Sequence, residues 1–406
     1  MASRLICLIG FIALLAGCAS LERRDALPAE TQRDATVLGL HGIRYWGGQD
    51  NSEFIRDADA AYDRELAAWR AAGHAELLPP ADFLAISGGG ENGAFGAGLL
   101  VGWTERGDRP VFKGVTGIST GALTAPFAFL GSDYDDDLRR VYTEITAADV
   151  LTPRSYFSAM MLDAAADTTP LRQTIARYFD QAMLDAIARE HDKGRILLIG
   201  TTNLDARRPI IWNVTEIAAS HRPGALELLH DILVASAAIP GAFPPVLVDV
   251  ELDGKPYQEM HVDGGASAQV FIYPPSLDVS ARDAERGLTR ERHLYIIRNS
   301  RLDPDWVQVQ RRTLSIAGRA ISSLIQTQGV GDLYQIYLTT QRDGFDYNLA
   351  YIPTSFDRPL NEPFESAYMQ ELFEVGHQMA LAGYPWAKAP PTFTMREQAA
   401  GAAERP

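Results

Sequence analysis

The stretch Val115-Thr116-Gly117-Ile118-Ser119-Thr120-Gly121, residues 115–121, decides the fold that we expect for this chain. It joins an apolar run that ends at Ile118 to an apolar, helix-compatible run at 122–130. A serine with Gly117 and Gly121 two residues to either side, between a strand and a helix, is typical of a nucleophile elbow, because larger side chains would collide in so sharp a turn. The dipole of the following helix would also favour negative charge at Ser119. The alternative is a glycine-rich helix start that the serine only caps.

The alternation of strand and helix continues outward from this turn in both directions. Apolar runs that predict buried strands occur at 83–86, 115–118, 196–200, 210–212 and 294–297, with helix-length segments between them. Strands separated by helices indicate an α/β fold with a mainly parallel sheet and helices on both faces.

This pattern also divides the chain. We expect a lead-in at 18–80, helical at 57–72, and a central domain at 81–300. A helical C-terminal extension follows at 301–390, with helical patterns at 306–340 and 365–382. The last residues, 391–406, are rich in alanine, glutamate and proline, which is typical of a disordered tail.

A glycine-rich loop, Ser87-Gly88-Gly89-Gly90-Glu91-Asn92-Gly93, follows the first strand of the central domain. Bare backbone N–H groups at Gly88, Gly89 and Gly90 suit an oxyanion hole, in which preorganised donors stabilise a tetrahedral intermediate. The spacing of Gly88, Gly90 and Gly93 also fits the G-x-G-x-x-G pattern of a dinucleotide site. That site requires an acidic residue at the end of the second strand, whereas Glu105 and Asp108 precede this strand, so the pattern favours the oxyanion hole.

Asp263-Gly264-Gly265 forms a third element, preceded by Met260-His261-Val262. An aspartate at a strand end can reach a neighbouring turn, and its carboxylate can act as general base for a serine hydroxyl without an imidazole. Partial desolvation would be needed to make it basic enough, because an unperturbed aspartate titrates near a pH of about 4. The alternative is an aspartate that only supports a turn.

These three elements occur in the order and context of the patatin-like phospholipases, which this sequence resembles over roughly residues 82–300. Two further stretches are similar to that family. They are Thr201-Thr202-Asn203-Leu204-Asp205 with Ile211-Trp212-Asn213, and Ala235-Ser236-Ala237-Ala238-Ile239-Pro240-Gly241-Ala242-Phe243-Pro244-Pro245-Val246. The resemblance implies a three-layer α/β/α sandwich, a modified α/β hydrolase fold. It also implies Ser119 as nucleophile, Asp263 as its base, and an oxyanion loop of Gly88, Gly89, Gly90 and Gly93.

The same resemblance implies a lipid acyl hydrolase that forms an acyl-enzyme and requires no metal or organic cofactor. The sequence does not distinguish a phospholipid, a lysophospholipid, a neutral glyceride and a thioester as substrates. Family members often carry arginine or lysine where this chain has Asn92, which puts a preference for phosphate headgroups in question. The apolar stretch 156–162 could form a lip for the acyl chain or a buried segment.

Two other functions stay open at this point. A Ser-Asp-His esterase or lipase is possible because His293 and His377 both follow Asp263, although neither lies in a recognisable loop motif after the sheet. The second is a non-catalytic lipoprotein that binds lipid or a partner with this fold. The intact Ser119, Asp263 and glycine loop argue against it.

The N-terminal residues predict export and lipid anchoring. Arg4 precedes an uncharged apolar run at 5–16, too short for a permanent span, which needs about 20 apolar residues. Leu15-Ala16-Gly17-Cys18 resembles the lipobox of bacterial lipoproteins, which implies removal of a signal peptide, 1–17, and acylation of Cys18. Ala19, where an aspartate would indicate the inner membrane, favours the outer membrane of a two-membrane bacterium. An ordinary secretory signal is the alternative.

Composition limits the partners and the sources of stability. A net charge of −15 with no basic stretch argues against nucleic acid and against broad electrostatic docking on anionic lipid. With 46% hydrophobic residues among 406, a large core is available. Cys7 leaves with the signal peptide, so the mature chain would keep Cys18 alone and no intramolecular disulfide. We see no metal-type cluster of cysteine and histidine, and the sequence leaves the oligomeric state open.

Overall fold

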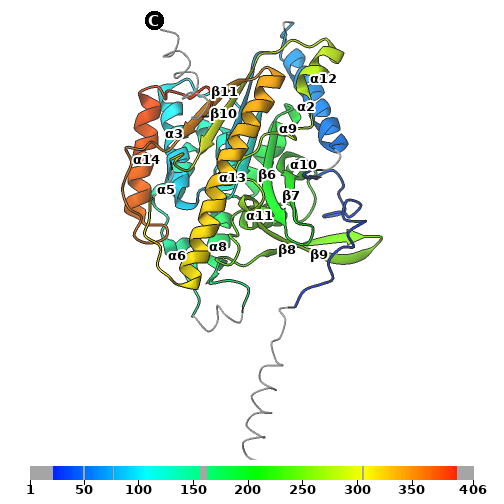
Figure 1. Cartoon of the computed structure of the whole chain (residues 1–406). Coiled ribbons are helices and arrows are strands. Elements are labelled where there is room, and N and C mark those ends of the chain that lie inside the picture. Colours follow the sequence, from blue (N-terminus) through cyan, green and yellow to red (C-terminus); the bar gives the residue numbers. More distant parts are fainter. Residues whose placement is uncertain (1–21, 49–50, 76, 156–161, 304–305, 391–406) are drawn as a thin grey trace, which may run out of the picture.

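A mixed β-sheet forms the centre of the molecule, with helices on both of its faces (Figure 1). The computed structural model describes residues 22–48, 51–75, 77–155, 162–303 and 306–390. The expected signal peptide, Cys18, most of the expected lip (156–161) and the tail at 391–406 lie outside the described residues.

The described part contains a nine-stranded sheet with the order β1-β7-β6-β3-β2-β10-β11, to which β9 adds through β6, and β8 through β9. The strands are β1 (Arg44–Trp46), β2 (Ala81–Ile86), β3 (Gly114–Ile118), β6 (Ile196–Asn203), β7 (Arg208–Asn213), β8 (Val246–Leu252), β9 (Lys255–Asp263), β10 (Arg292–Arg298) and β11 (Asp346–Tyr351). The pairs from β6 through β3, β2 and β10 to β11 are parallel, and the pairs of β1, β7, β8 and β9 are antiparallel. Short strands β4 (Thr152–Pro153) and β5 (Ala166–Asp167) pair separately.

The helices follow most of the parallel strands, as the sequence predicts. They are α2 (Ser52–Ala71), α3 (Gly93–Arg106), α4 (Thr120–Leu130), α5 (Asp135–Thr143), α6 (Ala147–Val150), α8 (Thr169–Tyr178), α9 (Gln181–Asp192), α10 (Val214–Ala219), α11 (Ala225–Ser236), α12 (Val279–Arg286), α13 (Thr313–Asp343) and α14 (Ser366–Leu381). Single 3₁₀ turns occur at η1 (Gly90–Asn92), η2 (Ser132–Tyr134) and η3 (Gly264–Ala266).

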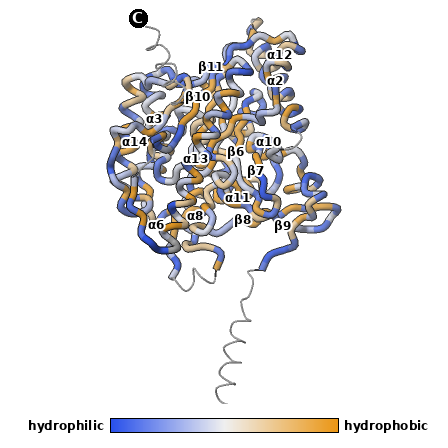
Figure 2. The backbone as a smooth tube through the Cα atoms, viewed as in Figure 1, coloured by the Kyte–Doolittle hydropathy of each residue, from blue (hydrophilic) through white to orange (hydrophobic). Residues whose placement is uncertain are grey.

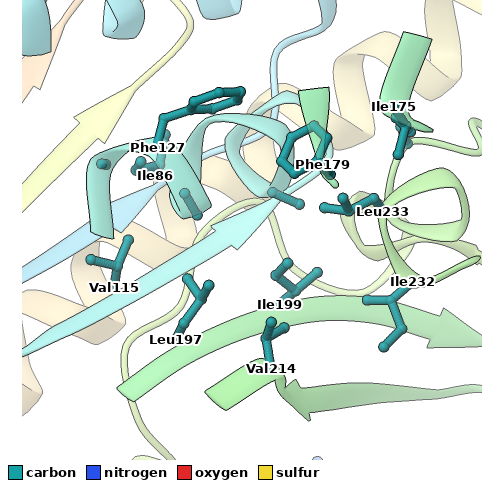
Figure 3. Packing of buried hydrophobic residues seen from close by; sticks show 14 of the residues in the cluster. Ile86, Val115, Phe127, Ile175, Phe179, Leu197, Ile199, Val214, Ile232 and Leu233 are labelled. Carbon is teal, nitrogen blue, oxygen red and sulfur yellow. The ribbon is translucent and has the colours of Figure 1, made fainter. Parts of the chain in front are cut away.

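Side chains alternate between the two faces of the central strands and bury two cores. Leu84 and Ile86 of β2 belong to the larger core, whereas Ala85 between them belongs to a second core under α13. Figure 3 shows part of the larger core, to which Ile86, Val115, Leu197 and Ile199 come from three neighbouring strands and Phe127 from α4. Helices therefore cover both faces, and the expected three-layer α/β/α arrangement is confirmed.

Helices α3 and α14 pack unusually closely because glycines line their contact. A Cβ atom at Gly98 of α3 would lie 2.0 Å from the carbonyl oxygen of Phe373, and one at Gly376 of α14 would lie 2.2 Å from that of Phe95. Only glycine permits these backbones to approach so far. In Figure 1 the two helices lie side by side at the left of the sheet.

The sequence analysis predicts no strand for β4, β5 or β8, nor for β1 and β11, which lie outside the expected central domain. β11 lies in the expected helical extension and pairs in parallel with β10, from His293↔Asp346 to Arg298↔Tyr351. β1 lies in the expected lead-in and pairs with β7. Both segments thus extend the central sheet. The helical patterns on either side of β11 led to the prediction that this region is entirely helical.

Hydrophobic residues concentrate around the centre of the sheet, and hydrophilic residues lie mostly at the periphery (Figure 2). Within the described ranges, every helix is too short or too polar to traverse a lipid bilayer.

Candidate active site

Ser119 occupies a sharp turn between β3 and α4. Its backbone has φ 56° and ψ −126°, and a residue with a side chain rarely adopts such a positive φ. The flanking glycines make the turn possible. A Cβ at Gly117 would lie 2.4 Å from the carbonyl oxygen of Gly121, and a Cβ at Gly121 would lie 2.3 Å from that of Ile86. The local geometry is therefore that of the predicted nucleophile elbow.

Strand β6 brings Asp263 to this turn although the two residues are 144 positions apart. Along one edge, β6 pairs first with β3, ending at Ile118↔Gly200, and then with β9, starting at Thr201↔Asp263. The end of β3 and the end of β9 therefore meet at consecutive residues of one strand. Close contact between Ser119 and Asp263 follows from this register.

The hydroxyl of Ser119 donates a hydrogen bond of 2.7 Å to Oδ2 of Asp263. The N–H group of Gly265 donates to Oδ1 of the same carboxylate, also at 2.7 Å. Both side chains are buried, with 7% of Ser119 and 5% of Asp263 exposed. Burial raises the pKa of Asp263 to about 6, although both hydrogen bonds act in the opposite direction.

The glycine loop lies directly beside the serine. A Cβ at Gly88 would lie 3.2 Å from Cβ of Ser119, and one at Gly93 would lie 2.2 Å from Oγ1 of Thr120. The N–H group of Gly88 donates to the carbonyl oxygen of Gln269 at 3.1 Å, so it is already used within the protein. In the described part of the chain, the N–H groups of Gly89 and Gly90 have no such partner.

An apolar pocket adjoins Ser119 on the side of α8. Gly90 and Glu91 of the glycine loop border it, and its walls include Leu123, Ile175, Phe179, Phe243 and Met369. A larger cavity of about 290 Å³ lies behind Gly264, next to Ile118 and Gly200, but Ser119 does not line it. The pocket beside Ser119 is therefore the one that could hold an acyl chain bonded to the serine.

Residues 84–274 match the family model described as patatin-like phospholipase. The chain is therefore similar to this family over just under half of its length. The family is one of carboxylic ester hydrolases, and the match contains the elbow, the glycine loop and the Asp263-Gly264-Gly265 turn.

Three solved structures are similar to about three quarters of the chain. VipD from Legionella pneumophila is 13% identical with a TM-score of 0.37, and the match covers 76% of this chain and 68% of that chain. Human GIVD cytosolic phospholipase A2 is 10% identical with a TM-score of 0.33, covering 79% and 55%. A chain of the complex of SpcU with ExoU, from the type III secretion system of Pseudomonas aeruginosa, is 13% identical with a TM-score of 0.31, covering 75% and 52%. No curated protein sequence matches the chain.

Asn92, which lies in the matched segment, contacts the C-terminal region. Its Oδ1 accepts a hydrogen bond of 2.7 Å from the hydroxyl of Tyr368 in α14. A neutral pair therefore ties the glycine loop to α14 at this position.

Two residues that sequence reasoning did not single out hold the site in place. Oγ of Ser236 accepts a bond of 3.0 Å from the N–H of Ser119 and donates one of 2.7 Å to the carbonyl oxygen of Gly200. The side-chain amide of Gln269 donates to the carbonyl oxygen of Gly265 at 2.8 Å, and the backbone carbonyl oxygen of Gln269 accepts the hydrogen bond from the N–H group of Gly88. Ser236 lies in one of the family-like stretches, but no pattern pointed to Gln269.

The two candidate triad histidines lie elsewhere. His293, at the start of β10, contacts Asp82 and Glu291, whereas Ser119 follows the end of β3, at the opposite edge of the parallel sheet. His377 in α14 contacts Glu105 at 2.8 Å. Among the described residues, no histidine bonds to Ser119 or Asp263.

The dinucleotide alternative is also disfavoured by the structure. Glu105 belongs to α3 and Asp108 follows it, and the end of β3 carries Ser119 in place of the acidic residue that a ribose would need. The described ranges contain no cluster of three histidine, cysteine, aspartate or glutamate side chains arranged to hold a metal ion.

Proposed function

We propose that this protein is a serine-dependent lipid acyl hydrolase, with Ser119 as nucleophile and Asp263 as general base. The observation that carries the proposal is the 2.7 Å contact between the two side chains, both buried, beside an apolar pocket. An exposed aspartate would be too weak a base at neutral pH, whereas a pKa of about 6 lies in the range in which a carboxylate can take and return a proton.

In the first stage, Oγ of Ser119 attacks the acyl carbonyl carbon while its proton passes to Asp263. A C–O bond forms and the carbonyl electrons move onto the oxygen. The tetrahedral intermediate then expels the alcohol, which takes the proton from Asp263. An acyl-enzyme on Ser119 remains.

In the second stage, water attacks the acyl-enzyme and gives its proton to Asp263. Collapse of this second intermediate releases the carboxylic acid, and the proton returns to Oγ of Ser119. The aspartate serves as base and then as acid in each stage, so no histidine is required.

The oxyanion of both intermediates would lie on the N–H groups of Gly89 and Gly90. Gly90 lines the pocket together with Ser119, and Gly89 precedes it in the same loop. Neither N–H group is used within the described part of the protein, whereas that of Gly88 is bonded to Gln269. The role of Gly88 and Gly93 is then to allow the loop to pack against Ser119 and Thr120 without collision.

The pocket supports recognition of the acyl chain more than of a charged headgroup. Its walls are mostly apolar, the acidic residue at its border is Glu91, and Asn92 with Tyr368 supplies neutral hydrogen bonding where a cation would attract phosphate. We therefore expect neutral and phosphate-containing acyl esters of equal chain length to be cleaved at comparable rates.

Replacement of Ser119 by alanine and of Asp263 by asparagine tests the dyad. We expect each variant to lose ester hydrolysis while His293→Ala and His377→Ala keep it, and we expect a fluorophosphonate probe to label the wild type but not the serine variant. Full activity in Asp263→Asn, or a histidine variant as inactive as Ser119→Ala, would refute the dyad. A folded wild type that the probe does not label would instead favour the non-catalytic lipid-binding function.

We also propose that Cys18 carries a lipid anchor in the bacterial envelope, with the outer membrane favoured. The lipobox-like sequence supports this. Four residue steps join Cys18 to Glu22, the first described residue, which allows about 14 Å of extended chain between the anchor and the folded part. Incorporation of a labelled fatty acid into the wild type, and its loss in Cys18→Ser, tests the anchor.

A further inference from the structure

The N-terminal half of α13 extends beyond the edge of the sheet where Ser119 lies. Gly329 of α13 packs against Arg298, the last residue of β10, since a Cβ there would lie 2.0 Å from the guanidinium. Gln326 donates to the carbonyl oxygen of Arg301, just after this strand. The helix from 313 to 326 therefore projects about 20 Å past the strand end, at about 1.5 Å per residue. In Figure 1 this end of α13 reaches the level of α6 and α8, which line the pocket beside Ser119.

Large hydrophobic side chains are exposed on this projecting part. Seven of the sixteen exposed large hydrophobic residues in the described ranges lie between 306 and 325. In the segment before the helix they are Trp306, 86% exposed, with Val307 and Val309. In the helix they are Ile316, Ile321, Leu324, 69% exposed, and Ile325. We call residues 306–325 the apolar projection.

The helical part of this projection turns its hydrophobic side away from the protein. Leu333, which is buried in the core under α13, fixes the direction of the protein body. Leu324 lies nine residues earlier, which is two and a half turns at about 3.6 residues per turn, so it points the opposite way. Ile321 lies about 60° from Leu324 on the outward side, whereas Ile325, about 100° from Leu324, lies on the flank of the helix. Core packing therefore does not account for these side chains.

The charge of the segment is opposite to that of the whole chain. Between Trp306 and Gly331 the sequence contains Arg311, Arg312 and Arg319 and neither aspartate nor glutamate, in a chain of net charge −15. Arg311 and Arg312 are exposed. A helix with outward hydrophobic residues, flanking arginines and an exposed tryptophan has the composition of a segment that lies in a membrane interface.

We propose that the apolar projection docks this protein on an anionic lipid bilayer. Trp306, Ile321 and Leu324 enter the interfacial region, and Arg311 and Arg312 contact the lipid headgroups. The active-site edge of the sheet then faces the membrane. The net charge of the chain disfavours anionic surfaces. However, charges farther from the bilayer than a Debye length, about 8 Å at physiological salt, are largely screened, so the arginines near the bilayer determine the electrostatic interaction with it.

A bilayer fits this surface better than a protein partner or a second copy. A second copy would bring the same arginines together, which costs free energy in the absence of acidic residues in the segment. The proposal concerns binding alone and does not depend on hydrolysis or on lipidation of Cys18.

The test uses the full chain with Cys18→Ser, so that no acyl anchor contributes. In this background, the double variant Ile321→Glu/Leu324→Glu is compared with a protein whose apolar projection is unchanged. Leu77→Glu/Val111→Glu is the control matched in charge, because Leu77 is 83% and Val111 77% exposed and they precede β2 and β3, at the opposite edge of the sheet. Vesicles of phosphatidylcholine with and without phosphatidylglycerol, and with brominated acyl chains, report binding by sedimentation and insertion by quenching of Trp306. A Trp306→Phe variant identifies the quenched signal.

We expect the double variant to bind phosphatidylglycerol vesicles at least tenfold more weakly than the control, with loss of quenching at Trp306. Hydrolysis of a water-soluble short-chain ester should be unchanged in it, because the projection lies outside the catalytic machinery. Equal quenching of Trp306 in the double variant and the control, or no quenching in either, would overturn the proposal. A protein that dimerises through the projection and does not bind vesicles would also overturn it. Absence of ester hydrolysis in every protein would count against the proposed function only.

Discussion

The buried Asp263 predicts that an inactivating substitution stabilises the protein. Its pKa is raised from an ordinary value of 3.8 to about 6 by loss of water around the carboxylate. At a pH of about 4 the carboxyl group is largely protonated in the folded state, so this burial costs little. Above a pH of about 6 the group is ionised in both states, and the folded state bears the full cost. Stability due to this group is therefore lost as the pH rises from about 4 to about 6.

The size of the effect follows from the two pKa values. Their difference, 6 minus 3.8, is about 2.2, and at about 1.36 kcal/mol for each tenfold change this is about 3 kcal/mol. In Asp263→Asn the amide oxygen can still accept from Gly265, and the amide nitrogen can donate to Ser119. One N–H group is left without a partner, at a cost of about 1 kcal/mol. We expect a net stabilisation of about 2 kcal/mol at a pH of about 8.

Urea unfolding of the wild type and Asp263→Asn at pH values of about 4 and about 8 measures this effect. As the pH rises, the free energy of unfolding of Asp263→Asn should increase relative to that of the wild type, while the variant lacks ester hydrolysis. Ser119→Ala is the control, because it also removes activity but keeps the buried carboxylate. A difference between wild type and Asp263→Asn that is independent of pH, or a wild type that is the more stable at high pH, would refute an elevated pKa of Asp263.

Three further predictions concern the site and its support. The value of kcat/KM for a soluble ester should rise with pH through about 6 and then level off, because Asp263 must be ionised to act as base; a plateau that begins near a pH of about 4 would contradict this. Gly121→Ala should lower the free energy of unfolding by about 3 kcal/mol or prevent folding, since its Cβ would lie 2.3 Å from the oxygen of Ile86, and an alanine variant as heat-stable as the wild type would show that the turn relaxes. Arg44→Ala should cost about 3 to 5 kcal/mol in urea unfolding because it leaves Glu259 buried without its cation, whereas Arg44→Met combined with Glu259→Met should cost much less; equal losses would mean that the ion pair is not the cause.

The elements that required glycine could be predicted from the sequence. Gly117 and Gly121 mark the elbow, and the structure shows that a Cβ at either position would overlap a backbone carbonyl. Such steric requirements are local, so they require glycine at fixed positions in the sequence around Ser119. For the same reason the runs 83–86, 115–118 and 196–200 predicted β2, β3 and β6.

The regions at the ends of the fold were harder to predict. β11 lies between two long helices, and its six residues form a strand because the edge of β10 is open to pair with them. Likewise, Gln269 acquires its role from three neighbours, Gly88, Gly265 and Asp332, which come together only in the folded chain.

The sequence by itself therefore determined where the turns, strands and candidate chemical groups lie along the chain, because each depends on a few consecutive residues. Tertiary structure alone decided which of these groups meet. The contact between Ser119 and Asp263 exists because β6 pairs with both β3 and β9, and the basicity of Asp263 arises from the burial that this pairing creates. Strand register and desolvation depend on residues far apart in the chain, so a local pattern does not record them.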